Sequence, residues 1–346
     1  MKLFKGLGSL ALFAVSVVCL SGCSFGMRMN YVYKDGDKYT AGDRQISEKI
    51  DTIDIDYMSG DVELIGADTD IVDIKETSKK QLDDKRKVHT WVDGTTLHVR
   101  YCKSANNLDL NDLEKHLKIT IPEDVKLNSS KVDVSSGDVT CSSILAENVD
   151  VSASSGDINV ECEASSVIMD ASSGDIILNQ TGDSNDIALE TSSGSITANI
   201  ENATKLTAKA SSGDITLDAK NIKDLKTETS SGENEFTFDT VPANSDITAS
   251  SGNVTIYLPE NTDLTAEIDS NEDVTYDLAF SKNDKTFVCG TGANHMKVET
   301  SSGEVSLKNH KTESESSDAS DVLSGDIGPG FSIISRGHLK GFSKHF

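Results

Sequence analysis

Serine and aspartate, two residue types that could do chemistry, recur beside one glycine along this chain. Residues 150–160 read DVSASSGDINV, and between residues 60 and 303 nine glycines have serine directly before them. A serine nucleophile needs one distinct copy with a base beside it, whereas these nine copies are equivalent. We therefore interpret the serines as a stacked column of inward hydroxyls that bond to the backbone or to one another.

The position after the glycine is acidic in most copies. It holds Asp61, Asp138, Asp157, Asp175, Asp214, Glu233 and Glu304. Like charges about 5 Å apart repel by roughly 1 kcal/mol in water, so stacked carboxylates must face solvent or share cations. We interpret them as caps of the turn that bond nearby backbone N–H groups. Calcium between the repeats is the alternative, with Asp138, Asp157, Asp175 and Asp214 as weak candidate ligands, since one carboxylate per repeat is a poor cage.

The repeat predicts the elements that must position these residues. Successive glycines between residues 137 and 252 are 18–20 residues apart, and apolar residues alternate with polar ones on both sides of each glycine. Each unit is thus a strand, a bend and a second strand, and so short a unit buries its inner face only by stacking on its neighbours. The sequence predicts an all-β, parallel β-solenoid, or β-helix, with coils of about 18–20 residues.

The glycine itself marks a corner of the coil. A left-handed backbone conformation costs a residue with a β-carbon about 1 kcal/mol or more, and glycine adopts it freely. The predicted turn-forming residues are Gly60, Gly137, Gly156, Gly174, Gly194, Gly213, Gly232, Gly252 and Gly303.

The first residues predict export and a lipid anchor. Residues 1–22 begin with two lysines, continue with an uncharged apolar run too short to span a bilayer, and end at Leu20-Ser21-Gly22-Cys23. This resembles a bacterial lipobox, so Cys23 would carry the lipid of a lipoprotein, such as palmitate, at the extracytoplasmic face of the cell membrane. The alternative is an ordinary cleaved signal peptide with a chance cysteine. Two acyl chains would give stable anchoring.

Beyond the signal peptide the chain divides into four parts. Residues 23–47 form a linker, 48–130 an N-terminal β cap with the first coils, 131–308 the regular solenoid, and 309–346 an acidic linker with a basic tail. Residues 109–116 are predicted to form one helical turn. After Gly252 we expect a degenerate coil, in which Asn271 replaces the glycine, then an insertion over 280–289, and then the last good copy, in that order.

Charge and composition exclude several classes of function. The chain has 57 acidic and 32 basic residues, a net charge of −25, which disfavours nucleic acid as a partner. From Lys131 to Lys308 there is no arginine and one histidine, His295, which we interpret as a surface loop residue, and the single tryptophan is Trp91 in the cap. No carboxylate pair stands apart from the rest, so we predict neither an enzyme nor a cofactor. Four cysteines, Cys102, Cys141, Cys162 and Cys289, lack metal-site spacing and are interpreted as isolated thiols.

Several of these motifs together resemble a known family. IDTIDIDYMSGDVELIG, TTLHVRY, LKITIPEDVKL, the Ser-Ser-Gly-Asp coils and CGTGANHMKVETSSGEVSL are similar to the "putative-adhesin" family of bacterial surface β-solenoids, over residues 48–308. The resemblance implies a right-handed or irregular parallel β-solenoid at the cell surface, in proteins that are often lipoproteins. It does not imply a ligand.

Three classes of function remain. The first is a non-catalytic, adhesin-like binding module that is anchored through Cys23 and binds a protein or glycan. The second is an envelope-stress accessory protein that contacts a membrane sensor. The third is a polysaccharide-degrading β-helix enzyme. We expect the first.

Overall fold

The computed structural model describes residues 28–110 and 113–310. The chain divides into two units, residues 1–311 and 312–346, and every described residue lies in the first. Cys23, the predicted signal peptide and the tail from residue 311 on lie outside the described residues. The described part contains strands and turns but no helix, so the helical turn expected within residues 109–116 is wrong for its six described positions, three of which belong to strands.

The described residues form 25 strands. They are β1 Arg28–Tyr31, β2 Thr40–Ala41, β3 Arg44–Ile46, β4 Thr52–Tyr57, β5 Asp61–Ala67, β6 Val72–Ser78, β7 His89–Asp93, β8 Thr96–Arg100, β9 Ala105–Asp109, β10 Lys115–Pro122, β11 Leu127–Val134, β12 Val139–Ala153, β13 Ile158–Ser173, β14 Ile176–Ser193, β15 Ile196–Ser212, β16 Ile215–Ser231, β17 Asn234–Phe238, β18 Asn244–Ser251, β19 Val254–Pro259, β20 Leu264–Ser270, β21 Val274–Tyr276, β22 Ser281–Asn283, β23 Thr286–Cys289, β24 Asn294–Ser302 and β25 Val305–His310.

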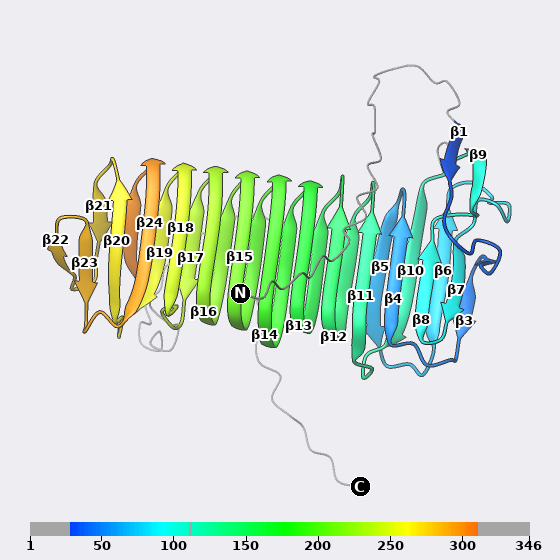
Figure 1. Cartoon of the computed structure of the whole chain (residues 1–346), viewed down its shortest axis with the longest axis horizontal. Coiled ribbons are helices and arrows are strands. Elements are labelled where there is room, and N and C mark those ends of the chain that lie inside the picture. The colour runs from blue at the N-terminus through cyan, green and yellow to red at the C-terminus, as the bar shows by residue number, and fades with distance from the viewer. Residues whose placement is uncertain (1–27, 111–112, 311–346) are drawn as a thin grey trace, which may run out of the picture. The chain divides into compact units, whose positions relative to one another are not determined.

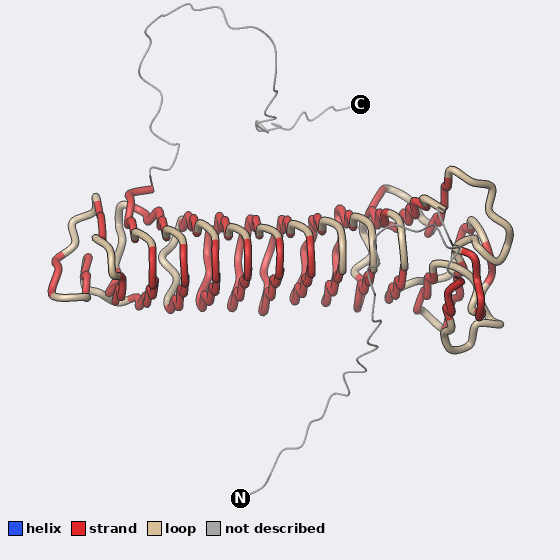
Figure 2. Tube along the Cα trace, turned by 90° about the horizontal axis from the view of Figure 1, so that it is seen from above, coloured by secondary structure: helices blue, strands red, loops and turns tan. Residues whose placement is uncertain are grey.

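Parallel coils stack one after another along this unit (Figures 1 and 2). Each coil has one leg before its glycine and one leg after it, and both legs pair in register with the next coil. For example, Ile196 pairs with Ile215, and Ser212 pairs with Ser231. The predicted all-β, parallel β-solenoid is confirmed.

The core consists of the inward-facing apolar side chains of both legs of each coil, and it runs through the whole stack. Val149 and Val151 before the glycine, and Ile158 and Val160 after it, are almost completely buried, while the residues between them face outward. This alternation has the period of two that a strand imposes. Stacking therefore buries an inner face that no single coil could cover.

At both ends of the solenoid the order of the coils departs from the order of the chain. β24 pairs with β18 on one side and with β20 on the other, so the last copy of the repeat lies between two coils that precede it in sequence. The degenerate coil, the insertion and the last copy follow one another along the chain, but in space the last copy lies inside the degenerate coil with Asn271. The β22–β23 hairpin of the insertion lies outside that coil. At the other end β4 lies between β11 and β8 in the same way.

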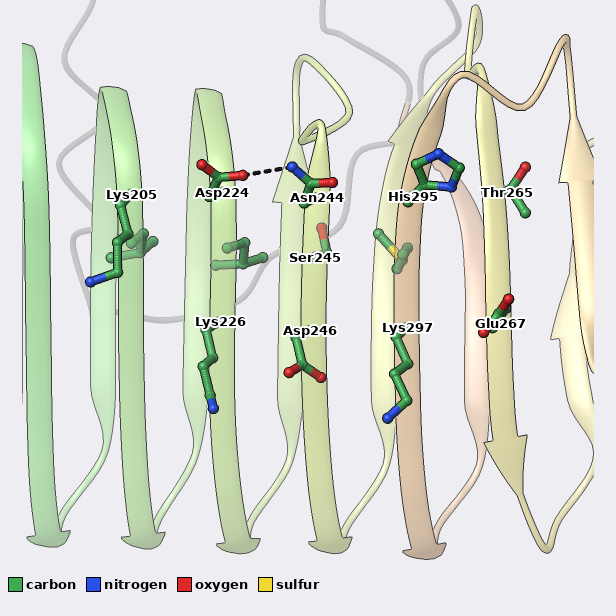
Figure 3. Close-up of a pocket in the computed structure, with 13 residues that line it drawn as sticks. Lys205, Asp224, Lys226, Asn244, Ser245, Asp246, Thr265, Glu267, His295 and Lys297 are labelled. Atoms are coloured by element: carbon green, nitrogen blue, oxygen red, sulfur yellow. Dashed lines mark hydrogen bonds between the residues drawn. The ribbon is translucent and has the colours of Figure 1, made fainter. Parts of the chain in front are cut away.

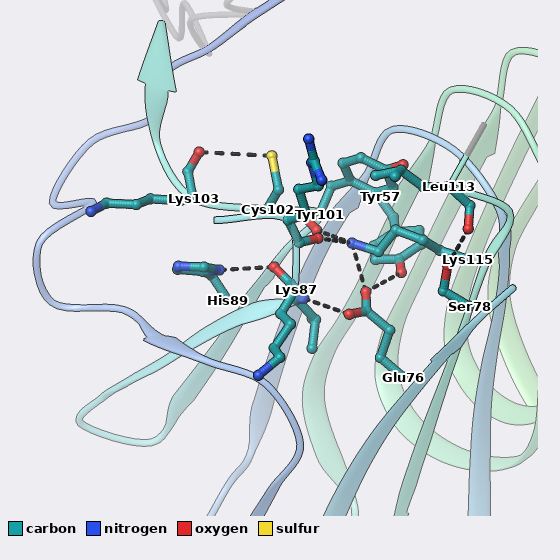
Figure 4. A network of polar contacts seen from close by, with 12 residues as sticks. Tyr57, Glu76, Ser78, Lys87, His89, Tyr101, Cys102, Lys103, Leu113 and Lys115 are labelled. Atoms are coloured by element: carbon teal, nitrogen blue, oxygen red, sulfur yellow. Dashed lines mark hydrogen bonds and ion pairs between the residues drawn. The ribbon is translucent and has the colours of Figure 1, made fainter. Parts of the chain in front are cut away.

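A buried ion pair closes the N-terminal end of the core (Figure 4). Lys115 Nζ lies 2.6 Å from Glu76 Oε1, and both side chains are almost fully buried. Glu76 also accepts hydrogen bonds from the Tyr57 hydroxyl and the Val88 amide, both at 2.8 Å, and Lys115 donates to the carbonyl of Tyr101. Burial lowers the pKa of Lys115, which Glu76 opposes. The open end of the coil stack is thus filled by a charged pair whose hydrogen bonds are satisfied within the cap.

No helix in the described part of the chain could cross a membrane, because that part contains none.

Candidate functional site

The repeated glycines form one straight column at a corner of the coils. All nine have a positive φ, between 102° and 153°. A β-carbon on any of the eight that follow Gly60 would overlap the carbonyl of the preceding glycine in the column, and one on Gly60 would overlap the carbonyl of Lys115. Glycine is therefore required both by the backbone conformation and by the close approach of the next coil.

The residues after the glycines link the coils through their side chains. Asp157 accepts a hydrogen bond from the backbone N–H of Asp175 at 2.8 Å, and Asp175 accepts one from Ser195 at 2.8 Å. Asp214 accepts from Glu233 at 2.8 Å, and Asn253 fills the same role with its amide oxygen toward Glu304. The carboxylates do bond backbone N–H groups, but those of the next coil instead of their own turn.

The serines before the glycines do not point inward. Both serines of every Ser-Ser-Gly copy are exposed, as is Ser59 in the Met-Ser-Gly copy. The expected column of inward hydroxyls is wrong, because it is the backbone of these serines that continues the ladder. Ser155 and Ser173, for example, accept hydrogen bonds from Gly137 and Gly156.

One hollow of the solenoid lies near its C-terminal end, on the legs before the glycines (Figure 3). It has a volume of about 340 Å³ and crosses five adjacent legs, which belong to β15, β16, β18, β24 and β20. We call it the coil groove. It is lined by Lys205, Leu206, Asp224, Leu225, Lys226, Asn244, Ser245, Asp246, Thr265, Glu267, His295, Met296 and Lys297.

Two rows of outward side chains form the walls of the coil groove. In register, one row runs Lys205, Asp224, Asn244, His295, Thr265, and the other runs Lys226, Asp246, Lys297, Glu267. The second row alternates in charge from coil to coil. It does so only because β24 is inserted between β18 and β20, which places Lys297 between two carboxylates.

Several polar groups of the coil groove are free to bind a ligand. Asn244 donates to Asp224 at 2.7 Å, and Lys226 and Lys297 pair with Glu228 and Glu299 along their own strands, at 2.7 and 2.6 Å. These bonds raise the pKa of both lysines, which keeps them charged. In contrast, the exposed side chains of Asp246, Glu267 and His295 make no hydrogen bond or ion pair within the described residues.

The floor of the groove contains a buried hydroxyl without a partner. Ser245 is 6% exposed, and its Oγ has no hydrogen-bond partner in the described chain. Its neighbours in register are Leu225 and Met296, so a small polar residue interrupts an apolar column. A buried hydroxyl without a partner costs about 1–3 kcal/mol.

The residues of this site were not predicted from the sequence. His295 lies on β24 and not in a loop, and it pairs in register with Asn244 and Thr265. One signal was present, because Ser245 is polar at an inward position where Leu206, Leu225 and Met296 are apolar. The neighbourhood of His295, however, depends on the insertion of β24.

The other predicted site residues lie apart from the groove. Within residues 28–110 and 113–310 no group of three or more His, Cys, Asp or Glu side chains could hold a metal ion. Cys102, Cys141, Cys162 and Cys289 are free, and burial raises the pKa of each of the first three thiols to about 12. Trp91 lies on β7 of the cap.

Comparison with known proteins gives a family and distant structural neighbours. A profile of the Toastrack DUF4097 family matches residues 50–308. None of the curated proteins matches the chain. Among solved structures, the fold resembles a "putative adhesin" of Parabacteroides merdae, with 11% identity, coverage of 82% of this chain and 100% of that one, and a TM-score of 0.43.

Two further structures are similar. A "putative adhesin" of Bacteroides fragilis has 14% identity, coverage of 78% of this chain and 96% of that one, and a TM-score of 0.40. A "putative cell adhesion protein" of Clostridium sporogenes has 10% identity, coverage of 78% and 100%, and a TM-score of 0.29. The family profile covers most of the chain, and the protein belongs to the Toastrack DUF4097 family.

Proposed function

We propose that this protein is a non-catalytic binding module, anchored by a lipid on Cys23 at the outer face of a bacterial cell membrane, and that the coil groove holds a glycan chain. The observation that supports this most directly is the shape and chemistry of the groove. It is elongated, open and lined by carboxylate, amide, amine and hydroxyl groups from five adjacent legs.

This lining suits a hydroxyl-rich, extended ligand better than an apolar one. Asp246, Glu267 and His295 offer unpaired acceptors and donors. Coils repeat about every 4.8 Å, so a linear chain can meet one set of side chains per coil. Many weak contacts of this kind can make binding specific, and the ligand need not be chemically changed.

The ligand part of the proposal is tested with a glycan array of neutral, amino and acidic oligosaccharides. The full chain is expected to bind one class, and Asp246→Ala/Lys297→Ala should weaken that binding at least about tenfold, the effect of losing about 1.4 kcal/mol. The control is Asp218→Ala/Lys220→Ala, which removes one exposed acid and one exposed base from the other leg of a coil. No binding to any glycan, or equal losses in both variants, would refute the site.

The anchor is tested separately by metabolic labelling with a fatty acid in a bacterial host. The wild-type chain should carry label, and Cys23→Ser should lose it and accumulate as uncleaved precursor. Label retained by the variant would contradict anchoring at Cys23.

A further inference from the structure

The N-terminal cap exposes apolar side chains at the place where the described chain begins. Met29 is 42% exposed and Val32 is 66% exposed, and they are two of the five large apolar residues exposed in the described chain. Both lie at or next to β1, which pairs with β9 beside the solenoid in a sheet of its own (Figure 1).

A belt of aromatic rings continues from this place across the cap. Ring centroids of Tyr33 and Tyr39 are 4.8 Å apart, those of Tyr39 and Trp91 are 5.6 Å apart, and Lys38 lies over Trp91 at 4.5 Å. Tyrosine and tryptophan favour the interface between a membrane and water, since one end of each ring is apolar and the other is polar.

Two segments near β1 differ in charge from the chain as a whole. Residues 28–49 and 79–110 carry twelve Lys and Arg against eight Asp and Glu, whereas the whole chain has 32 against 57. The side chains of Arg28, Lys34 and Lys103 make no ion pair with another described residue. An anionic lipid surface would therefore attract these two segments and repel the coils.

The length of the chain before the cap limits what can cover this surface. Four residues lie between Cys23 and Arg28, and the five Cα–Cα steps of this stretch span at most about 18 Å even when fully extended. If Cys23 carries lipid, β1 is held within that distance of the bilayer. The surface that bears Met29, Val32 and the free basic residues is then the part of the described chain nearest to lipid.

We infer that the cap docks on an anionic bilayer through Met29, Val32, Arg28 and Lys34, with the solenoid pointing away from the membrane. This inference rests on the proposed anchor at Cys23, and it adds an orientation that the anchor alone does not require. β18, in the middle of the coil groove, lies seven coil spacings from β4, or about 34 Å farther from the lipid.

Trp91 is the only tryptophan of the chain, so its fluorescence reports on the cap alone. The full lipidated protein is placed in vesicles of phosphatidylcholine and phosphatidylglycerol that carry a nitroxide on the lipid headgroup. We expect Trp91 fluorescence to fall markedly in these vesicles. A second variant, Trp91→Phe/Tyr276→Trp, moves the probe to an exposed position at the opposite end of the solenoid and should show no quenching.

A matched pair of variants tests the docking surface. Met29→Ser/Val32→Ser should reduce quenching of Trp91 at least about twofold, whereas Ile168→Ser/Ile177→Ser, which changes two exposed apolar residues of the coils, should leave it unchanged. Equal quenching of both probes would mean that the solenoid lies parallel to the membrane surface. No quenching in a chain shown to carry lipid would mean that the cap does not contact the membrane. Either result overturns the inference, whereas a chain without lipid refutes the proposed anchor instead.

Discussion

At the scale of single residues, the corner glycine is required for two separate reasons. Its φ is positive, and the carbonyl of the neighbouring corner occupies the space of a β-carbon. Gly94, in the turn between β7 and β8, has a positive φ of 63°, but a β-carbon there would meet no other atom within 4 Å. A substitution at Gly94 would therefore introduce backbone strain alone, whereas one at a corner glycine would add a steric clash with the next coil.

We expect Gly213→Ala to lower the free energy of unfolding by at least about 3 kcal/mol, because the stacked coils must move apart as well as strain the backbone. Gly94→Ala should cost about 1 kcal/mol from strain alone. Urea denaturation of the two variants measures both values. Equal losses would show that close approach contributes nothing at the corner.

At the scale of the coil, the side chain after the glycine connects each unit to the next. In the copies where Asp is replaced, Asn253 and Ser195 still accept from the next backbone N–H, at 2.9 and 3.2 Å. The common requirement is thus an acceptor oxygen and not a negative charge. This favours the hydrogen-bonding interpretation of the acidic column over calcium binding.

Changing Asp157, Asp175 and Asp214 together to Asn should leave the free energy of unfolding within about 1 kcal/mol of wild type, because each amide oxygen still accepts. At low salt the change should stabilise slightly, since repulsion along the column is relieved. The same three changes to Ala should cost roughly 1 kcal/mol each. Urea denaturation of both triple variants at low and high salt measures these differences.

A chelator gives the complementary test of calcium in this column. We expect it to shift the wild-type melting temperature by no more than about 2 °C. A larger drop that calcium reverses, and that the Asn variant lacks, would show that the column binds the ion.

At the scale of the whole solenoid, the repeat was sufficient to predict the coils but not their order at the ends. A spacing of 18–20 residues with alternating apolar residues specifies strand, corner and inward face. It does not specify which coils lie next to the last copy of the repeat, because every copy offers the same backbone hydrogen-bonding groups. The sequence from Gly252 to Gly303 therefore does not reveal that β24 lies between β18 and β20.

The same reason explains why the groove escaped prediction. Asp246, Lys297 and Glu267 form one row only through that insertion, although Ser245 was visible as a polar break in an apolar column. The outward direction of the corner serines was also missed. A motif of small polar residues fits either face of a bend, and its backbone hydrogen bonds decided the outcome.

Hydrogen exchange can verify the order of the coils. Although β24 and β25 end the described chain, their amides should be protected about as well as those of β16, because both strands have partners on each side. β21 and β22 at the outer end should exchange faster. Rapid exchange in β24 and β25 would mean that the chain ends in a frayed edge.

Near both ends of the solenoid there are strands with a partner on each side, and this pairing affects the response of the molecule to mechanical force. A strand bonded on one side only can be peeled away under tension one hydrogen bond at a time. β25 is bonded to β19 and to β21, and β4 is bonded to β11 and to β8. Tension that reaches β4 or β25 along the chain therefore acts on the backbone hydrogen bonds to both neighbouring strands at once. Neither strand is the outermost of its sheet. The solenoid should therefore resist unfolding from its ends.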